Sequence, residues 1–401
     1  MKTIERTDYL RKLTRWKGKD VIKVITGIRR CGKSTLLKQF QEKLISQGVN
    51  PQHIISINFE DYSFIELVDP KKLHEYVIDK IDESKKIYLF LDEIQNVNDF
   101  QRVVDSFYLR KNIDLYITGS NANLLSGDLA TMLSGRYVAI EMLPLSFGEF
   151  VEAKDHSTDL ANLYRQYIET SSFPYALELM DDREALQEYL DGIYSTVVLK
   201  DVIGHLVNVA PLILESIVRF LMSSIGSRIS TKKIADTLVS QGRKVDVRTV
   251  EKYLNGLLGG YIFYRAKRYD IKGKQHLKTL EKYYCADIGL RNALIGGRGF
   301  DAGHVLENVI YLELLRRGYA VSIGKIGEME IDFVAEKSGT IEYYQVSAST
   351  RDPETLKREL RPLQLIKDNY PKFIFTLDDD PVGNHEGILR MNALDWLVDS
   401  Y

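Results

Sequence analysis

Short apolar runs alternate with amphipathic segments through the first third of the chain. The runs "DVIKVITG", "HIISINFED", "KKIYLFLDEI" and "IDLYITGSN" are typical of buried strands. Segments with helical spacing, such as "KSTLLKQFQEKLISQG" and "DFQRVVDSFYLRK", separate them. Strands that alternate with helices in this order predict a parallel sheet with helices on both faces. We therefore expect an α/β fold with a parallel sheet over residues 1–148.

The pattern changes after "GRYVAIEMLPLSFGEF". Helical spacing dominates residues 149–208, for which we predict a helical lid or linker. Three short amphipathic segments and two strand-like runs fill residues 209–288, an order that predicts a winged helix-turn-helix. Residues 289–401 combine helical segments with strand-like runs such as "EMEIDFVAE", "IEYYQVSAS" and "KFIFTLD". We expect a further α/β domain there.

Composition narrows the class of protein. Of 401 residues, 44% are hydrophobic and 27% are charged, as in folded globular chains. The net charge of −2 excludes a global basic field, so any contact with nucleic acid must be local. The two cysteines, Cys31 and Cys285, are too far apart in sequence for a CxxC motif. With no apolar run of about 18 residues and no signal peptide, we expect a cytoplasmic protein without a membrane segment.

A phosphate-binding motif lies between a predicted strand and a predicted helix. The stretch "GIRRCGKST" fits G-x-x-x-x-G-K-[ST] at every fixed position. Its glycines let backbone N–H groups surround phosphate oxygens, and the following helix adds its positive N-terminal dipole. Lys33 is expected at the β- and γ-phosphates and Ser34 at Mg²⁺. The nucleotide-binding residues are then Gly27, Ile28, Arg29, Arg30, Cys31, Gly32, Lys33, Ser34 and Thr35, with ATP and Mg²⁺ as cofactors.

An acidic pair ends the strand run "IYLFLDE". Asp92 is expected to hold the water shell of Mg²⁺, and Glu93 to orient and deprotonate the attacking water. A small-molecule kinase would not need a water-activating glutamate beside the metal aspartate. The pair therefore favours an ATPase.

Two further groups are candidates for the phosphate site. Ser120 or Asn121, at the end of "ITGSN", is placed to sense the γ-phosphate, although either also suits an ordinary strand-to-helix cap. Arg136 in "LSGRY" is a candidate to stabilise the charge of the transition state, in its own subunit or in a neighbour. Its alternative is an ion pair with an acidic residue of the sheet.

The motifs "TGIRRCGKSTLL", "LDEIQ", "ITGSNA", "LSGRY" and "PLSFGEF", in this order, resemble a large prokaryotic family of AAA-type ATPases with a C-terminal domain of unknown function. The resemblance covers nearly all of the chain. It implies an ATPase core, a helical lid, a winged helix and a C-terminal lobe similar to restriction-endonuclease-like nucleases. It also implies that Pro174 in "SSFPYAL" contacts the adenine, although Ser172 replaces the glycine usual at that motif.

DNA is one candidate partner. In "VDVRTVEKYLNGLL", the polar side would present Arg248, Thr249, Lys252 and Asn255 to a groove. Basic residues of the following hairpin would meet phosphates, namely Arg265, Lys267, Arg268, Lys272 and Lys274. The alternative is a domain that packs on the nucleotide domain, with a protein partner or self-association in place of DNA. For Arg29 and Arg30 in the phosphate loop, we expect one of two roles: service to a neighbouring subunit, or simple screening of phosphate charge.

The C-terminal lobe contains a degenerate nuclease motif. Glu307 and Asp332 match the carboxylates of such a site, but Gln345 takes the place of the second motif carboxylate and Ser347 that of the lysine. A lysine from elsewhere in the chain could reach into the site, and Lys325 and Lys337 are the nearest candidates. A neutral amide is a poor ligand for Mg²⁺. We therefore expect no bound metal and no cleavage of nucleic acid at this site. For the whole chain, we expect an ATPase whose nucleotide state controls its C-terminal domains. An ATP-coupled nuclease is the further alternative.

Overall fold

The computed structural model describes residues 4–125, 133, 135–154, 159–197, 202–206, 209–296 and 302–399. The chain divides into two compact units. The N-terminal unit extends to Pro144 and includes the distant segment Gly259–Tyr261, and the C-terminal unit comprises the rest of the chain from Leu145. Within the described ranges, no helix has the length and apolar character needed to cross a lipid bilayer.

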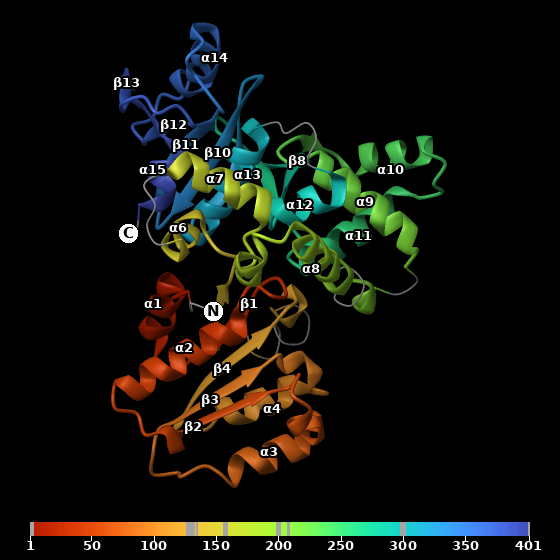
Figure 1. Ribbon diagram of the computed structural model, residues 1–401, viewed down its shortest axis with the longest axis vertical. Coiled ribbons are helices and arrows are strands. Elements are labelled where there is room, and N and C mark those ends of the chain that lie inside the picture. Colours follow the sequence, from red (N-terminus) through yellow and green to blue (C-terminus); the bar gives the residue numbers. More distant parts are fainter. Residues whose placement is uncertain are drawn as a thin grey trace. The chain divides into compact units, whose positions relative to one another are not determined.

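A five-stranded parallel sheet, in the order β2-β3-β4-β1-β5, forms the centre of the N-terminal unit (Figure 1). This confirms the predicted α/β fold. The strands and helices, in chain order, are α1 (Thr7–Trp16), β1 (Ile22–Thr26), α2 (Lys33–Ser46), β2 (Ile54–Asn58), α3 (Pro70–Ile78), β3 (Ile87–Asp92), α4 (Phe100–Tyr108), β4 (Ile113–Gly119) and β5 (Tyr137–Glu141).

Helices cover both faces of this sheet. Every residue of β1, β3 and β4 is buried, as expected for central strands of a parallel sheet. On one face, Phe40 of α2 packs against Phe90 and Tyr116. On the other face, Leu73 of α3 and Phe107 of α4 join one hydrophobic cluster with the strands. Since helices bury both faces, the edge where the strands end is left for polar side chains. The polar residues that follow the strands gather at this edge.

That edge holds the phosphate loop. β1, β3 and β4 end there, at Thr26, Asp92 and Gly119, because the strands are parallel. Gly27 follows β1 with a φ of +147°, and a Cβ atom at this position would lie 2.1 Å from the backbone oxygen of Met142. Only glycine fits this combination of backbone angle and close approach.

A nine-stranded mixed sheet, in the order β13-β14-β12-β11-β10-β9-β7-β8-β6, runs through the C-terminal unit (Figure 1). Its strands are β6 (Arg228–Ile229), β7 (Phe263–Asp270), β8 (Gln275–Cys285), β9 (Ala320–Ile326), β10 (Met329–Lys337), β11 (Thr340–Val346), β12 (Lys372–Thr376), β13 (Gly383–His385) and β14 (Ile388–Asn392). β7 pairs in parallel with β9, so the hairpin of the predicted winged helix and the C-terminal strands share one sheet. The domain boundary that the sequence predicts after residue 288 therefore falls between strands of one continuous sheet.

The helices of this unit are α6 (Phe147–Ala153), α7 (Leu160–Thr170), α8 (Arg183–Ser195), α9 (Pro211–Ser223), α10 (Thr231–Ser240), α11 (Val247–Gly259), α12 (Ile288–Ile295), α13 (Ala302–Arg316), α14 (Pro353–Gln364) and α15 (Ala393–Val398). The three helices and the hairpin expected over residues 209–288 are present, as α9–α11 and β7–β8. The pairing of β6 with β8 adds a third short strand to that hairpin. α6–α8 fall in the predicted lid, of which residues 155–158, 198–201 and 207–208 lie outside the described part.

Candidate functional site

The phosphate loop leads into α2 without a side-chain cap. Gly32, at the N-cap position, has a φ of +103° and supplies no side-chain cap. Arg30, also with a positive φ, is exposed, and Arg29 pairs with Glu60 at 2.7 Å. Cys31 is buried, which raises the pKa of its thiol and makes it unreactive. The uncapped N–H groups at the start of α2 suit an anion.

Lys33 points into the loop. Its ammonium donates hydrogen bonds to the backbone oxygens of Gly27, at 3.0 Å, and Ile28, at 3.3 Å. It also lies 3.6 Å from a carboxylate oxygen of Glu93. Lys33 is only 4% exposed. The cation expected at the β- and γ-phosphates is therefore inside the loop, where phosphate oxygens can replace its present partners.

Asp92 ends β3 beside Ser34, as a shared Mg²⁺ site requires. Burial raises the pKa of Asp92, whereas hydrogen bonds from the hydroxyls of Thr118 and Ser34 lower it. The Thr118 hydroxyl donates to Asp92 and also accepts the backbone N–H of Glu93 at 2.8 Å. The donor set of a carboxylate and a hydroxyl fits Mg²⁺, with Ser34 and Asp92 as the residues that would hold it. Thr118 is a residue of this site that the sequence analysis missed.

Glu93 adopts a left-handed backbone conformation, with a φ of +56°, at the end of β3. Such a conformation is rare for a non-glycine residue and is often found at functional sites. One carboxylate oxygen faces Lys33, and the other accepts a hydrogen bond from the Gln95 amide at 2.5 Å. The same amide lies 3.4 Å from the Ser120 hydroxyl at the tip of β4. The structure thus brings Lys33, Glu93 and Ser120 together through Gln95, a second residue that the sequence analysis missed.

Asn121 and Arg136 have different environments. Asn121 is buried next to Ser120, and its backbone oxygen accepts from Leu124 at the start of a 3-10 turn. Arg136 pairs with Asp105 of α4 at 2.5 Å and lies level with the first residue of β1. Five residues of strand separate that level from the loop, a distance of roughly 17 Å. Arg136 is thus paired with a helix in this structure, and not with the acidic residue of the sheet that was its expected alternative. Its role at a phosphate, in its own subunit or in a neighbour, stays a prediction.

The "SSFP" segment is held by a buried carboxylate of its own unit. Asp287, the N-cap of α12, accepts hydrogen bonds from the Ser171 hydroxyl and from the backbone and hydroxyl of Ser172, between 2.6 and 3.0 Å. This explains a serine at position 172, where the resemblance implies glycine, because its side chain is used. Pro174 follows in this C-terminal unit, so its contact with adenine stays a prediction.

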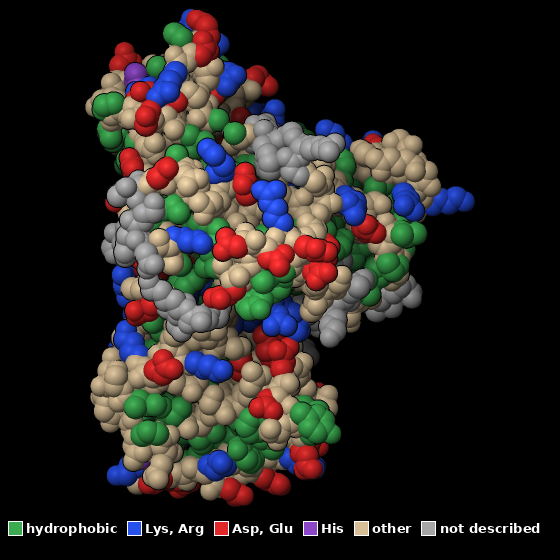
Figure 2. Space-filling model, in the orientation of Figure 1, with side chains coloured by type: hydrophobic (Ala, Val, Ile, Leu, Met, Phe, Trp, Pro, Cys, Tyr) green, Lys and Arg blue, Asp and Glu red, His purple; other side chains and the backbone are tan. Residues whose placement is uncertain are grey.

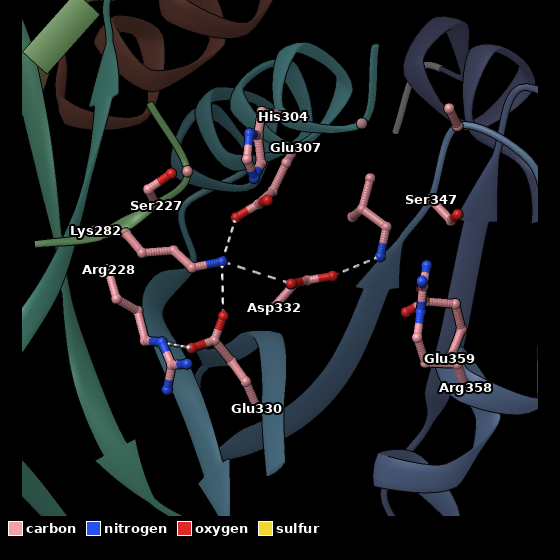
Figure 3. A pocket seen from close by; sticks show the side chains of 14 residues that line it. Ser227, Arg228, Lys282, His304, Glu307, Glu330, Asp332, Ser347, Arg358 and Glu359 are labelled. Carbon is pink, nitrogen blue, oxygen red and sulfur yellow. Dashed lines mark hydrogen bonds and ion pairs between the residues drawn. The ribbon is translucent and has the colours of Figure 1, made fainter. Parts of the chain in front are cut away.

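A polar cavity of about 570 Å³ lies where β8, β10, β11, α13 and α14 meet. At its wall, the Lys282 ammonium lies 2.8 Å from Glu307, 2.9 Å from Glu330 and 3.6 Å from Asp332 (Figure 3). The four side chains come from three different elements and point toward one another. Burial alone would lower the pKa of Lys282, but the three carboxylates raise it above its ordinary value. The lysine in this cleft is therefore Lys282, and neither Lys325 nor Lys337.

Gln345 and Asp332 are opposite each other, as strand alternation predicts. The Gln345 side-chain oxygen accepts the backbone N–H of Asp332 at 2.9 Å, and its amide donates to Glu359 at 2.7 Å. The amide oxygen and the amide nitrogen of the Gln345 side chain are thus both hydrogen-bonded to other protein groups. Burial and the nearby Glu307 carboxylate raise the pKa of Asp332 to about 8. Among the residues that the structure describes, no three His, Cys, Asp or Glu side chains are arranged to hold a metal ion.

Some of the candidate DNA-binding residues are exposed to solvent, and one of them is buried. On α11, Arg248, Lys252 and Asn255 are exposed, while the opposite side of the helix is buried. Arg268 is only 8% exposed, because the alternation of side chains along β7 places it on the same buried face as Tyr264 and Ala266. Its expected phosphate contact is wrong for this conformation. Figure 2 shows basic and acidic side chains interspersed over the face in view, so any contact with DNA would be local.

Comparisons with known proteins agree with this architecture. Residues 19–151 match a family described as an AAA domain, and residues 161–301 match one described as a domain of unknown function (DUF8612). An uncharacterized protein of Haemophilus influenzae is 41% identical over 400 residues, 98% of each chain. "Uncharacterized protein MJ1544" of Methanocaldococcus jannaschii is 31% identical over 392 residues, 90% of this chain and 82% of its own. The Walker-type ATPase PABY2304 of Pyrococcus abyssi has a similar fold, with a TM-score of 0.50 and 16% identity over 73% of this chain and 96% of that chain.

Proposed function

This chain belongs to the family of AAA-type P-loop ATPases that includes its Haemophilus influenzae and Methanocaldococcus jannaschii relatives, and from this premise we propose that it hydrolyses ATP with Mg²⁺ to control its own C-terminal unit. The observation that supports hydrolysis is the convergence of Lys33, Ser34, Asp92 and Glu93 at one edge of the sheet. The N-terminal unit alone then supplies a cation for the phosphates, ligands for the metal and a candidate general base.

Each residue has a distinct part in the reaction. The backbone N–H groups of the loop and Lys33 bind the β- and γ-phosphates, and Lys33 neutralises charge that develops on them. Ser34 and Asp92 would hold Mg²⁺, which when bound would withdraw electron density from the phosphate oxygens. Glu93 orients a water and accepts its proton as the water oxygen bonds to the γ-phosphorus. The bond from that phosphorus to the β–γ bridging oxygen breaks, which gives ADP and inorganic phosphate as separate products.

The test of this function compares two lysines of one helix. Lys33→Ala removes the cation inside the loop, whereas Lys38→Ala changes an exposed position of α2. We expect Lys33→Ala to lose ATP binding by on the order of 100-fold, and Lys38→Ala to bind and hydrolyse ATP as the wild type does. Equal ATP affinity in the two variants, measured by calorimetry with and without Mg²⁺, would refute the assigned nucleotide site.

A covalent link supports control of the C-terminal unit by nucleotide. Gly259–Tyr261 continues directly from α11 yet packs in the N-terminal unit. There the Tyr261 hydroxyl donates to the Thr26 hydroxyl at 2.9 Å, one residue before the phosphate loop begins. Tyr261 is 5% exposed and has a φ of +57°, so the surrounding structure fixes it tightly. A change at the loop thus has a direct path along the chain to α11.

DNA is the proposed target of that control, and the exposed basic side of α11 supports it. We expect duplex DNA to stimulate the ATPase rate, and the stimulation to fall steeply as salt rises, because phosphate contacts release counterions. Arg248→Ala with Lys252→Ala should remove the stimulation, while Lys357→Ala, an exposed position of α14, should retain it. Stimulation that is absent for all variants at low salt would favour the second candidate, a regulatory ATPase with a protein partner.

An ATP-coupled nuclease is a further candidate because Lys282 reaches the carboxylates of the C-terminal cavity. In this class of site, a lysine stabilises the attacking water or the charge on phosphorus. Nicking of supercoiled DNA with Mg²⁺ or Mn²⁺, lost in Asp332→Ala while ATPase activity persists, would establish it. No nicking by the wild type under either metal would leave the cavity as a binding or structural feature.

A further inference from the structure

Gln95 links the candidate base to the strand that is expected to sense the γ-phosphate. Its amide nitrogen donates to Glu93, which follows β3, and lies 3.4 Å from the hydroxyl of Ser120, which follows β4. Glu93 and Ser120 are both nearly fully buried, at 6% and 2% exposed. A single side chain therefore contacts the polar groups at the ends of two neighbouring strands.

The orientation of this amide is determined by its partners. A carboxylate only accepts hydrogen bonds, so the nitrogen of Gln95, and not its oxygen, must face Glu93. Among the residues that the structure describes, the Gln95 oxygen consequently has no hydrogen-bond partner, although it is buried. It lies over Gly119, where a Cβ atom would be only 2.8 Å away from it. Leaving a buried acceptor unpaired costs about 1–3 kcal/mol.

This cost argues against simple packing. A methionine has nearly the length of glutamine, contains no acceptor to leave unpaired, and fills irregular gaps well. If Gln95 only filled space beside Gly119, an apolar side chain would be at least as stable there. The glutamine is explained by what its N–H group does, which is to hold one oxygen of Glu93.

We propose that Gln95 is the positioning residue that keeps Glu93 oriented for water activation when ATP occupies the loop. In the present structure Glu93 is held on both sides, by Lys33 on one oxygen and Gln95 on the other. Phosphate draws Lys33 away, since the lysine is the cation for the β- and γ-phosphates. Gln95 then remains the donor that fixes the carboxylate, and its position depends on Ser120 at the tip of β4. This rests on the proposed hydrolysis and adds the residue that sets the geometry of the base.

Gln95→Met tests the proposal with a side chain of similar size and no donor. We expect kcat to fall on the order of 10- to 100-fold, because a misplaced base loses most of its contribution. The affinity for ADP and KM for ATP should stay within about twofold, since the phosphate-binding groups are intact. Gln52→Met, at an exposed position, is the matched control and should leave kcat unchanged. Gly119→Ala, which forces the Gln95 oxygen to move, should lower kcat in the same way as Gln95→Met.

A double mutant separates action through Glu93 from a structural effect. If Gln95 acts only by orienting Glu93, Gln95→Met should add nothing to the loss caused by Glu93→Gln, because the base is already absent. An additive further loss, or a wild-type kcat in Gln95→Met, would overturn the proposal. A wild-type protein that does not hydrolyse ATP at all would instead refute the proposed function. The two failures are therefore distinguishable.

Discussion

The protonation state of Asp92, a candidate metal ligand, depends on a hydrogen bond from the hydroxyl of Thr118. Burial raises the pKa of this carboxyl, and hydrogen bonds from the Thr118 and Ser34 hydroxyls oppose the effect. Ser34 would turn to Mg²⁺ in the loaded enzyme, which leaves Thr118 as the protein donor to Asp92. Thr118 also satisfies the backbone N–H of Glu93. Removal of this one hydroxyl should therefore affect both the metal ligand and the placement of the base.

Thr118→Val makes that change with little change in volume. Loss of the donor should raise the pKa of Asp92 further, so the proton competes with Mg²⁺ up to a higher pH. We expect the Mg²⁺ concentration for half-maximal ATPase activity to rise more at pH 6 than at pH 8. The unpaired N–H of Glu93 should also lower the free energy of unfolding by about 1–3 kcal/mol. An Mg²⁺ requirement equal to that of the wild type at both pH values would contradict this role.

Asp332 gives the C-terminal unit a pH dependence of known sign. Its pKa rises from an ordinary value of 3.8 to about 8 in the folded protein. Between these values the folded state binds more protons than the unfolded chain, so the free energy of unfolding should fall as pH rises through this window. Asp332→Asn cannot titrate, and its stability relative to the wild type should increase with pH by up to about 1 kcal/mol per pH unit.

The measurement is urea unfolding between pH 5 and pH 8. Trp396 is in this unit, and the protein has 2 tryptophans, so a Trp16→Phe background isolates its fluorescence. Asp181→Asn, at an exposed position, is the control and should follow the wild type. A wild-type stability that rises across this pH range in parallel with the Asp332→Asn variant would show that Asp332 is ionised throughout.

At the scale of elements, the connection from α11 to the phosphate loop is the proposed route by which nucleotide would control the C-terminal unit. Tyr261→Phe removes only the hydroxyl that bonds to Thr26. We expect a loss of about 0.5–1.5 kcal/mol in stability, an unchanged fold, and a loss of the difference in amide exchange over α11 between the ATP and ADP states. Tyr164→Phe is the control, because the buried Tyr164 hydroxyl has no hydrogen-bond partner within the described part of the chain. Nucleotide-dependent exchange that persists in Tyr261→Phe would place the coupling elsewhere.

Elements and their local motifs were predictable from sequence, and strand partners were not. The strands of the first unit follow from apolar runs, and Lys33, Ser34, Asp92 and Glu93 follow from motifs at strand ends. Lys282 lies in the run "EKYYCAD", which locally resembles one strand of a hairpin. Only the pairing of β7 with β9, between residues far apart in sequence, joins this hairpin to the strands β9 and β10, the second of which contains Asp332. Such non-local pairing has no local sequence signal, so the lysine of the cavity was assigned to the wrong candidates.

At the scale of the whole molecule, both units contain buried charges that belong to sites rather than to the core alone. In the N-terminal unit, Lys33, Asp92 and Glu93 are buried together at the end of the sheet. In the C-terminal unit, Lys282 is buried among Glu307, Glu330 and Asp332. Buried charges are retained only when they are paired or functional, because desolvation is costly. The molecule is thus best described as an ATPase unit joined to a second unit with a polar cavity of its own.

Hydrolysis of ATP by the first unit is the central claim, and Glu93→Gln tests it most directly. In a single-turnover experiment with radiolabelled ATP, the wild type should release phosphate in the presence of Mg²⁺. The Glu93→Gln protein should bind ATP with comparable affinity and retain it uncleaved, with a rate reduced by on the order of 100-fold or more, because only the proton acceptor is lost. Phosphate release by Glu93→Gln at the wild-type rate would contradict the account.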